Sequence, residues 1–386
     1  MYLQDLRDDL VELDRQSLRR ARRTLETPCG PHARVDGAPC LAFCSNDYLG
    51  LAGDPRLAEA LAEGAARWGA GSGASHLVSG HYAAHDQLEA ELAAWCGCDR
   101  SLSFSTGYMA NLAAVSALAG RGDAIFADRL NHASLVDGAL LSGATFKRYP
   151  HRDTAALEAA LAASSARHKL IVSDTVFSMD GDVAPLPALL DLAERHDALL
   201  LLDDAHGLGV LGPEGAGALA HFGLRSERIV LVGTLGKAAG LAGAFVAGSQ
   251  TVIEWLLQKA RSYIFTTAAP PALAHALLCA VRLVRDADPA RAQLAQLVAR
   301  LREGLADVPW TLADSMTPIQ PLITGSNDSA LALASGLRER GIWVPAIRPP
   351  TVPRGSARLR ISLSAAHTRA DVDQLLAALG ELAAAS

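Results

Sequence analysis

The sequence predicts an α/β fold, in which a large domain has a mostly parallel sheet with helices on both faces and a smaller C-terminal α+β domain follows. From about residue 55, helical segments alternate with short apolar runs that are typical of strands buried in a parallel sheet. Such an alternation requires crossover connections, which place the carboxyl ends of the strands at one edge. Near residue 270 the pattern changes to two long helices, followed by shorter strands.

The elements of the N-terminal and large parts follow from local periodicity. Leucines at helical spacing predict an N-terminal amphipathic helix that packs on another surface through Leu3, Leu6, Leu10 and Leu13. In the large domain, helices are expected over residues 55–68, 83–96, 107–118, 154–164, 186–196 and 250–260. The intervening strands are expected over residues 101–105, 124–127, 170–173, 199–202 and 229–232.

The C-terminal part is expected to form a domain of its own. Helices are expected over residues 270–285, 289–305 and 369–383, and strands over 319–323, 342–344 and 358–363. In the last strand Leu359 and Ile361 alternate with Arg358 and Arg360, which is typical of a half-buried strand. The chain is therefore expected to divide into an N-terminal helical segment (1–45), a large cofactor-binding domain (46–270) and a small domain (271–386).

The composition excludes several classes of protein. Of 386 residues, 50% are hydrophobic and 20% charged, which excludes a mainly disordered chain. The net charge of −6 and an aromatic content of 5% argue against a nucleic-acid partner. No window approaches the roughly 18 apolar residues of a membrane span, and the N-terminus mixes acids and arginines unlike a targeting peptide. We therefore expect a soluble, cytoplasmic protein without a membrane partner, and with no CxxC pair among its six cysteines we expect no disulfide framework.

Three short patterns resemble well-known ligand motifs but lack their context. The GxGxxG spacing at residues 207–212 continues as irregular loop, whereas a dinucleotide site requires a helix there. A nicotinamide-dependent dehydrogenase is nevertheless the alternative from another class. The glycines before Lys237 resemble a phosphate loop, but Ala238 stands where a hydroxyl is required. His81 and His85 are four residues apart, but without a third ligand nearby we expect helix capping or packing and no metal site.

One lysine and one aspartate at neighbouring strand ends carry the strongest chemical signal. Lys237 follows the strand at 229–232 among glycines and alanines, and Asp203 ends the strand at 199–202. A lone lysine there would be read as a solvated loop residue. A carboxylate at the end of an apolar strand, however, is costly unless it meets a positive partner. Pyridoxal phosphate requires this pair: an amine that reacts with its aldehyde, and an acid that keeps its ring nitrogen protonated.

Other polar groups are expected at the same edge of the sheet. Backbone N–H groups at the start of the helix at 107–118 are suited to a phosphate, although Thr106 could simply cap that helix. His132 could stack on a pyridine ring and His206 could bond its hydroxyl, with a loop histidine and a metal ligand as the respective alternatives. The candidate cofactor contacts are Thr106, Gly107, Tyr108, His132, Ser178, Asp203, His206, Thr234 and Lys237.

Longer segments of the chain resemble a known family. They are SNDYLGL at 45–51, GSG at 71–73, NHAS at 131–134, VFSMDG at 176–181, DDAHG at 203–207 and TLGK at 234–237. Together they resemble the α-oxoamine synthases, which are pyridoxal-phosphate enzymes of fold type I, and the resemblance extends over nearly the whole chain. It implies an aspartate-aminotransferase-like fold, pyridoxal 5'-phosphate as cofactor, and acyltransferase activity.

The C-terminal segments indicate the branch within this family. AIRPPTVP at 346–353 and ARLR at 357–360 resemble the branch that condenses L-alanine with a pimeloyl thioester in biotin biosynthesis. The acyl donor, pimeloyl-CoA or pimeloyl acyl carrier protein, is left open by the sequence. The alternative is a sister branch that uses glycine, such as 2-amino-3-ketobutyrate CoA ligase or 5-aminolevulinate synthase.

The resemblance also implies roles for individual residues. The catalytic residues are Lys237 as cofactor anchor and base, Asp203 at the ring nitrogen, and His132 stacked on the ring. The substrate-binding residues are Arg20 (with Arg22 and Arg23 as alternatives), Asn46, His132, Thr351 and Arg360. Arg360 is expected to bind a carboxylate, and its alternative is an exposed edge-strand arginine. The enzyme is expected to be a homodimer in which Thr267 reaches the cofactor phosphate of the partner.

Overall fold

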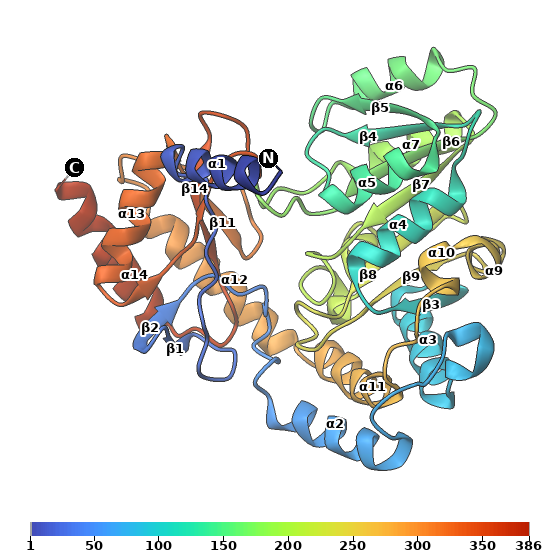
Figure 1. Ribbon diagram of the computed structural model, residues 1–386, viewed down its shortest axis with the longest axis horizontal. Helices are drawn as coiled ribbons and strands as arrows, with labels where there is room; N and C mark the ends of the chain where they lie inside the picture. Colours follow the sequence, from blue (N-terminus) through green and yellow to red (C-terminus); the bar gives the residue numbers. More distant parts are fainter. Residues whose placement is uncertain (1, 386) are drawn as a thin grey trace. The chain divides into compact units, whose positions relative to one another are not determined.

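The computed structural model describes residues 2–385, and its contacts divide the chain into two compact units (Figure 1). The larger unit comprises Leu49–Ser178 and Asp182–Arg291. The smaller unit comprises the chain up to Tyr48, Met179–Gly181 and the chain from Ala292 onward. The division expected at residue 270 thus falls inside the larger unit, because the helix that follows it packs there; the three-part division stays a prediction.

The larger unit is built on a seven-stranded sheet in the order β3-β9-β8-β7-β6-β4-β5. The strands are β3 (Arg100–Phe104), β4 (Ala124–Asp128), β5 (Thr145–Tyr149), β6 (Lys169–Asp174), β7 (Ala198–Asp203), β8 (Ile229–Thr234) and β9 (Ala244–Gly248). Strands β4 to β8 pair in parallel, whereas β9 runs antiparallel to β3 and β8. The predicted mostly parallel sheet is confirmed.

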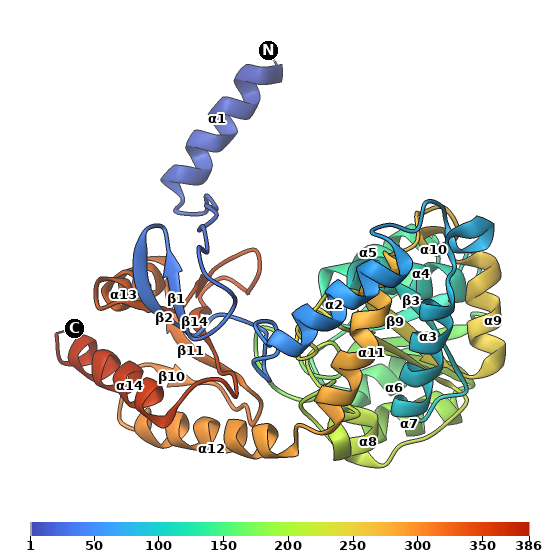
Figure 2. The same ribbon diagram turned by 90° about the horizontal axis from the view of Figure 1, so that it is seen from below.

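Helices cover both faces of this sheet (Figure 2). They are α2 (Pro55–Trp68), α3 (Ala83–Cys96), α4 (Gly107–Leu118), α5 (Ala133–Ser142), α6 (Thr154–Ala162), α7 (Leu186–Arg195), α8 (Ala218–Phe222), α9 (Gln250–Lys259), α10 (Arg261–Ile264) and α11 (Pro271–Arg285). Successive strand residues point to opposite faces: Ile125 and Val172 pack with α4 and α5, and Phe126 and Ile171 pack with α6 and α7. This double burial explains why the strands read as continuous apolar runs.

Close packing fixes α11 in the larger unit. At Gly64 of α2, a Cβ atom would lie 2.7 Å from the carbonyl oxygen of Ala272, so only glycine permits this approach of α2 to α11. Since α11 also packs on α3, it belongs with the sheet that precedes it rather than with the strands that follow.

The smaller unit contains two short sheets, in the orders β1-β2-β12 and β10-β11-β14-β13. Its strands are β1 (His32–Val35), β2 (Ala38–Ala42), β10 (Thr311–Leu312), β11 (Ile319–Gly325), β12 (Ile342–Trp343), β13 (Ala346–Ile347) and β14 (Ala357–Ser362). Its helices are α1 (Tyr2–Arg15), α13 (Asn327–Glu339) and α14 (Arg369–Ala384), and α12 (Asp288–Gly304) crosses the division between the units.

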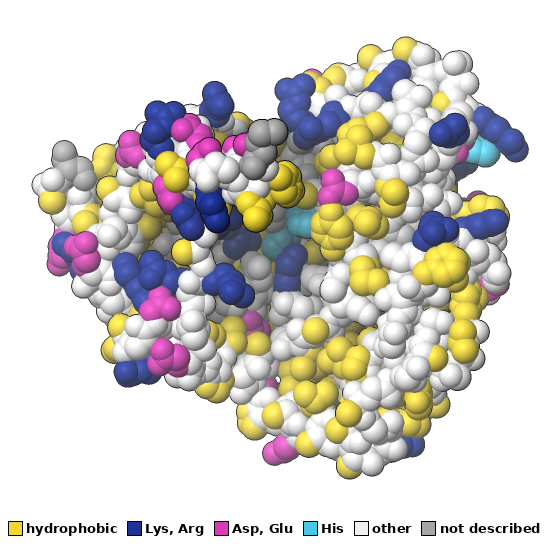
Figure 3. All heavy atoms as spheres, viewed as in Figure 1, with side chains coloured by type: hydrophobic (Ala, Val, Ile, Leu, Met, Phe, Trp, Pro, Cys, Tyr) yellow, Lys and Arg dark blue, Asp and Glu magenta, His cyan; other side chains and the backbone are white. Residues whose placement is uncertain are grey.

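Two features of the smaller unit differ from expectation. β14 pairs on both sides, with β11 and β13, and Arg360 is only 5% exposed, so the alternative of an exposed edge-strand arginine is wrong. α1 buries none of its residues in this chain, although it was expected to pack on a surface; hydrophobic and charged side chains are both visible on it in Figure 3. No helix in residues 2–385 has both the length and the apolar character to span a membrane.

A charged histidine links three segments of the larger unit. His151 Nδ1 lies 3.0 Å from Asp128 Oδ1, and its Nε2 lies 2.8 Å from Asp182 Oδ2. Burial disfavours the charge on His151, but the hydrogen bonds and charges of these two carboxylates outweigh it and raise its pKa to about 9. The two carboxylates therefore hold His151 protonated at neutral pH and tie β4 to the segment that contains Asp182.

This contact predicts a pH dependence of stability. Because the folded pKa of about 9 exceeds the model value of 6.5, the stabilisation is fully present below pH 6.5 and is lost as the pH rises through 9. With His151 partly exposed, the expected loss is about 1–3 kcal/mol. His151→Gln should flatten this decline in the thermal midpoint between pH 6.5 and 9, whereas the exposed control His168→Gln should retain it. An equal decline in His151→Gln would assign the slope to other groups.

Candidate active site

The carboxyl ends of four parallel strands place the predicted polar residues at one edge of the larger unit's sheet. Asp174 ends β6 and is the register partner of Asp203, which ends β7. His132 follows β4 and forms the N-cap of α5. Lys237 lies three residues beyond the end of β8. Parallel pairing thus converts positions that are far apart in the sequence into neighbours along one edge.

These side chains surround a cavity of ≈180 Å³. It is lined by Gly107, Tyr108, Asn111, His132, Ser134, Asp174, Asp203, Ala205, His206, Val232, Gly233, Thr234 and Lys237. Seven of the predicted cofactor contacts are among them: Gly107, Tyr108, His132, Asp203, His206, Thr234 and Lys237. These seven residues therefore lie together at one edge of the sheet, as expected from the sequence, and their roles stay predictions.

Lys237 is held in a tight loop after β8. Its Nζ atom lies 3.0 Å from His206 Nε2, and its carbonyl oxygen accepts the N–H of Gly240 at 2.9 Å. Gly240 has φ +73°, and a Cβ atom there would lie 2.6 Å from the carbonyl carbon of Leu51. Glycine is therefore required for the turn that directs the lysine to the cavity.

Asp203 is held by two N–H donors. Asn111 Nδ2 donates to its Oδ2 atom at 2.6 Å, and the backbone N–H of Ala205 donates to its Oδ1 atom at 3.0 Å. Asn111 Nδ2 also lies 2.9 Å from Ser134 Oγ, which fixes the orientation of the amide. Since both bonds are donated to Asp203, its surroundings suit a carboxylate.

His132 is held as a neutral ring. Its Nδ1 accepts the backbone N–H of Ser134 at 3.3 Å and lies 2.7 Å from Ser134 Oγ, so the hydrogen is assigned to Nε2. Burial, reinforced by the charge of Lys237, lowers its pKa despite the opposing effect of Asp203. A neutral imidazole with a fixed Nε2–H can stack on a ring and donate one hydrogen bond.

Asp174 is a cavity residue that the sequence analysis missed. Its Oδ2 accepts the backbone N–H of His132 at 2.7 Å, which positions that histidine. Burial, and then the negative charge of Asp203, raise its pKa well above the usual range, so Asp174 takes up a proton more readily than an ordinary carboxyl. It ends β6 as Asp203 ends β7, so the same strand-end rule would have found it. Asn111 and Ser134 lie inside helices, and only the folded positions of α4 and α5 reveal them.

Three predicted cofactor contacts do not line the cavity. Thr106 caps α4 by accepting the N–H of Met109 at 3.2 Å, which was its alternative role. Ser178 and Thr267 are also absent from the lining, so their cofactor roles stay predictions. By contrast, Gly107 and Tyr108 line the cavity at the first turn of α4, where N–H groups and the helix dipole favour an anion.

Apart from His132, which lines the cavity of the larger unit, the predicted substrate residues belong to the smaller unit. Arg360 Nη1 donates to Ser362 Oγ at 2.6 Å and its Nη2 donates to Asn46 Oδ1 at 3.1 Å, so Arg360 and Asn46 are in direct contact. Of the three N-terminal candidates, Arg23 is bonded to Asp36 at 2.9 Å, whereas Arg20 is exposed in the segment after α1. Thr351 is exposed in the proline-rich turn.

The cavity residues fit pyridoxal phosphate. The lining combines a primary amine, a carboxylate held by N–H donors, a neutral imidazole and a helix N-terminus. At Gly107 the nearest atom to an added Cβ would be Thr234 at 3.9 Å, so the backbone there is open to a ligand. Asp203, whose two oxygens accept N–H donors, is suited to pair with a cation such as a protonated pyridine. Residues 207–212, in contrast, form turns and no helix, so the context of a dinucleotide motif is missing.

Comparisons with known proteins agree with this arrangement. The sequence model of the family "Aminotransferase class I and II" matches residues 38–379. The chain is 66% identical, over 100% of both sequences, to an 8-amino-7-oxononanoate synthase of Aromatoleum aromaticum. Its structure is similar, with TM-score 0.93 and 29% identity over 99% of this chain and 97% of the other, to a structure of SPT with a PLP internal aldimine. An 8-amino-7-oxononanoate synthase structure from Francisella tularensis matches with TM-score 0.77 and 32% identity over 89% of this chain and 97% of that one. The predicted fold type and cofactor are confirmed.

Proposed function

The chain belongs to the 8-amino-7-oxononanoate synthases of the class I and II aminotransferase family, and we propose how its residues carry out the reaction. L-Alanine and a pimeloyl thioester give 8-amino-7-oxononanoate, CO₂ and the free thiol in biotin biosynthesis. The cofactor is pyridoxal 5'-phosphate. One observation supports the proposed catalytic roles: Lys237, Asp203 and His132 line the same cavity.

The bound cofactor supplies an aldehyde that condenses with primary amines and a protonated ring that accepts the electron pair left by a departing proton or carboxylate. Lys237 would hold it through its Nζ atom, and Asp203 would keep the ring nitrogen protonated. His132 would lie against the ring face. The N–H groups at the start of α4 would hold the phosphate. Ser178, Thr106 and Thr267 remain proposed contacts.

The chain's own groups would then move the protons of the reaction. With its amine free, Lys237 would act as the base that removes the Cα proton of the bound alanine. His206, whose Nε2 is 3.0 Å from the lysine Nζ, would keep the amine in place. The Nε2–H of His132 would donate to the alanine carboxylate. The overall reaction would join the alanine Cα to the thioester carbonyl carbon, release the thiol and CO₂, and return one proton to Cα, for which the Lys237 amine is the proposed donor.

Arg360 is proposed to bind a substrate carboxylate. A buried guanidinium whose partners include a hydroxyl and an amide suits a planar anionic ligand. Arg360→Ala should weaken L-alanine binding by about 10²-fold or more, because a carboxylate would lose its charged partner. The dissociation constant is measured by titrating the cofactor absorbance with L-alanine. Arg358→Ala is the matched control, since Arg358 is a buried strand neighbour bonded to Asp180 at 2.7 Å. Unchanged binding in Arg360→Ala would remove Arg360 from the substrate site.

A preference for a long acyl donor is the second expectation. The three prolines of the turn at 348–353 fix a rigid backbone beside Thr351, and an exposed arginine, Arg20, is proposed to meet the distal carboxylate. Each buried methylene contributes ~0.8 kcal/mol, and pimeloyl has three more than succinyl. The value of kcat/KM with L-alanine should therefore be ~10²-fold higher for pimeloyl-CoA than for succinyl-CoA. Equal values would contradict this pocket. Arg20→Ala should reduce the preference for pimeloyl-CoA, and a larger reduction in Arg22→Ala would assign the role to Arg22.

The finer assignments are proposals too. We propose a cytoplasmic homodimer, supported by the apolar side chains of Tyr2, Leu3 and Val11, which are 75%, 67% and 65% exposed on α1. Thr267 is proposed to reach the partner's cofactor, next to Phe265, which is 71% exposed. The acyl donor is pimeloyl-CoA or pimeloyl acyl carrier protein.

The function is tested by crossing two amino acids with several thioesters. L-Alanine and glycine are each incubated with pimeloyl-, succinyl- and acetyl-CoA and with pimeloyl acyl carrier protein, and the products are identified by mass spectrometry. The expected major product is 8-amino-7-oxononanoate from L-alanine and a pimeloyl donor. A major product from glycine and acetyl-CoA would instead place the chain in the ligase branch.

A further inference from the structure

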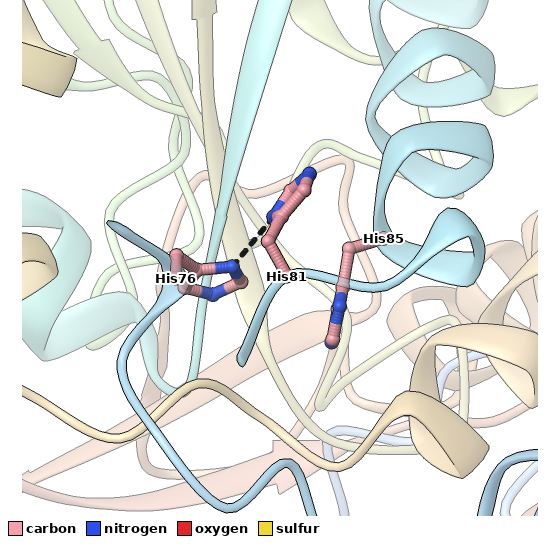
Figure 4. Close-up of side chains that lie close together, drawn as sticks. All are labelled: His76, His81 and His85. Atoms are coloured by element: carbon pink, nitrogen blue, oxygen red, sulfur yellow. Dashed lines mark hydrogen bonds between the residues drawn. The ribbon is translucent and has the colours of Figure 1, made fainter. Parts of the chain in front are cut away.

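Three histidines meet at the start of α3 in the larger unit. His76 begins the π-turn η1 (His76–Gly80), His81 follows it, and His85 lies in the first turn of α3. One ring nitrogen from each histidine lies within 4.8 Å of those of the other two (Figure 4). The expectation of no metal site was based on the missing third ligand, and η1 brings His76 to the other two. Gly80 permits this turn, since a Cβ atom there would lie 2.0 Å from Ala74 O.

We propose that His76, His81 and His85 bind one divalent transition-metal ion, for which Zn²⁺ is the suited probe. Within residues 2–385 this is the one group of three or more histidine, cysteine or acidic side chains with ligand atoms this close together. Imidazole nitrogens are preferred ligands of Zn²⁺, and three of them leave a fourth position for water.

The outer nitrogens of two rings already have the partners found around metal-bound histidines. His81 Nε2 lies 2.8 Å from Asp86 Oδ1, and His85 Nε2 lies 2.9 Å from the carbonyl oxygen of Ala269. These acceptors place the hydrogen on Nε2 and leave Nδ1 as the lone-pair atom. His81 Nδ1 faces His76 Nδ1 at 2.7 Å. The hydrogen bonds of the two Nε2 atoms therefore make Nδ1 the lone-pair nitrogen of both His81 and His85.

Two of the rings are also buried and fixed. His76 and His85 are 9% and 1% exposed, so their rings are held by the surrounding residues. The ring of His76 stacks on the ring of Tyr263, with 4.7 Å between the ring centroids and an interplanar angle of 9°. Little side-chain freedom is lost when such preorganised ligands bind an ion.

Binding requires small local shifts. With Zn–N distances of about 2.0–2.1 Å, the nitrogens of tetrahedral ligands lie about 3.3 Å apart. The two ring nitrogens that are now farthest apart must therefore move closer, and the Nδ1 atoms of His76 and His81 must move slightly apart. The ion would displace the hydrogen between His76 and His81, leaving His76 with its hydrogen on Nε2. It would also displace the N–H of Tyr82, which now donates to His85 Nδ1 at 3.0 Å. His81 is partly exposed and is the ring that can turn to admit the ion.

The proposed metal site lies in a segment that is hydrogen-bonded to the residues directly after Thr267, the predicted phosphate contact. Ala268 N donates to Ala74 O at 3.0 Å, and Ser72 Oγ donates to Ala268 O at 2.6 Å. His85 adds the bond to Ala269. A bound ion would thus fasten the segment before α3 against the segment that carries Thr267.

The test uses the holoenzyme without a polyhistidine tag, after dialysis against EDTA and metal-free buffer. Calorimetric titration with Zn²⁺ should show one ion per chain with a dissociation constant of about 10 μM or tighter. His81→Ala should weaken binding about 100-fold, and Asp86→Asn at its exposed outer position about 10-fold. The exposed control His221→Ala should bind as the unmodified enzyme does. Binding should also raise the thermal midpoint of the enzyme but not of His81→Ala.

Several results would overturn the proposal. They are a dissociation constant above 10 μM for the unmodified enzyme, unchanged binding in His81→Ala or Asp86→Asn, or an equal loss in His221→Ala. Circular dichroism and cofactor absorbance of each metal-free variant show whether it is folded. Should His81→Ala not fold, the exposed Asp86→Asn variant decides alone.

Discussion

Lys237→Ala is expected to give a folded protein that has lost condensation activity, with kcat lower by about 10⁴-fold or more. Lys237 is the lysine that lines the cavity, and its Nζ is the amine beside His206. With the proposed roles of Lys237, its loss would remove both the covalent attachment of the cofactor and the base that moves the Cα proton. Turnover is measured with L-alanine and pimeloyl-CoA, and the visible absorbance reports the attached cofactor.

Lys259→Ala is the matched control for this substitution. Lys259 lies at the end of α9, where its Nζ is 5.3 Å from the centre of the Trp255 ring. The control loses the same charge away from the cavity and should keep its activity and absorbance. Activity in Lys237→Ala within tenfold of that of the control would assign the base to another residue.

Asp203→Asn should retain the fold and bind the cofactor, but kcat should fall by about 10³-fold, with a smaller change in the binding of L-alanine. An amide cannot sustain the charge on a protonated ring nitrogen. It would also place one amide against the Nδ2 of Asn111, which now donates to Asp203 at 2.6 Å. The measurement is steady-state kinetics together with spectral titration of L-alanine.

Asp204→Asn separates the roles of the two adjacent acids. Asp204 accepts hydrogen bonds from Thr175 Oγ1 and from the N–H of Ala218, and burial raises its pKa to about 7. Asp204 does not line the cavity, so the folded fraction of Asp204→Asn should retain most of the kcat of the unmodified enzyme. A larger loss of kcat in Asp204→Asn than in Asp203→Asn would exchange their roles.

Much of the fold was predictable because buried strands and amphipathic helices leave periodic patterns. The predicted helix at 107–118 coincides with α4, and the parallel order of the strands followed from the alternation. Two strands of the larger unit's sheet were missed for physical reasons: β5 carries Lys147 and Arg148 on an exposed edge, and β9 consists largely of small residues. The sequence carries no signal for which neighbour α11 packs against, so its place with the larger unit could not be predicted.

The site was predictable to the extent that its residues follow strands. Lys237 and Asp203 were found by that rule, which also applies to Asp174 but was not used there. Asn111 gives no such signal, because one polar residue inside an apolar helix has many possible reasons. The alternation of Arg360 with Leu359 and Ile361 is also typical of a half-exposed strand, so it did not reveal that Arg360 is buried. A strand covered on both faces can carry an arginine when its guanidinium is hydrogen-bonded inside the protein.

The most direct test of the central claim is to map the lysine that carries the cofactor. The holoenzyme is reduced with borohydride, digested and analysed by peptide mass spectrometry. The expected result is a single pyridoxyl adduct on Lys237, the lysine that lines the cavity together with Asp203 and His132. An adduct on Lys147, Lys169 or Lys259 instead would contradict the assignment of this cavity as the active site.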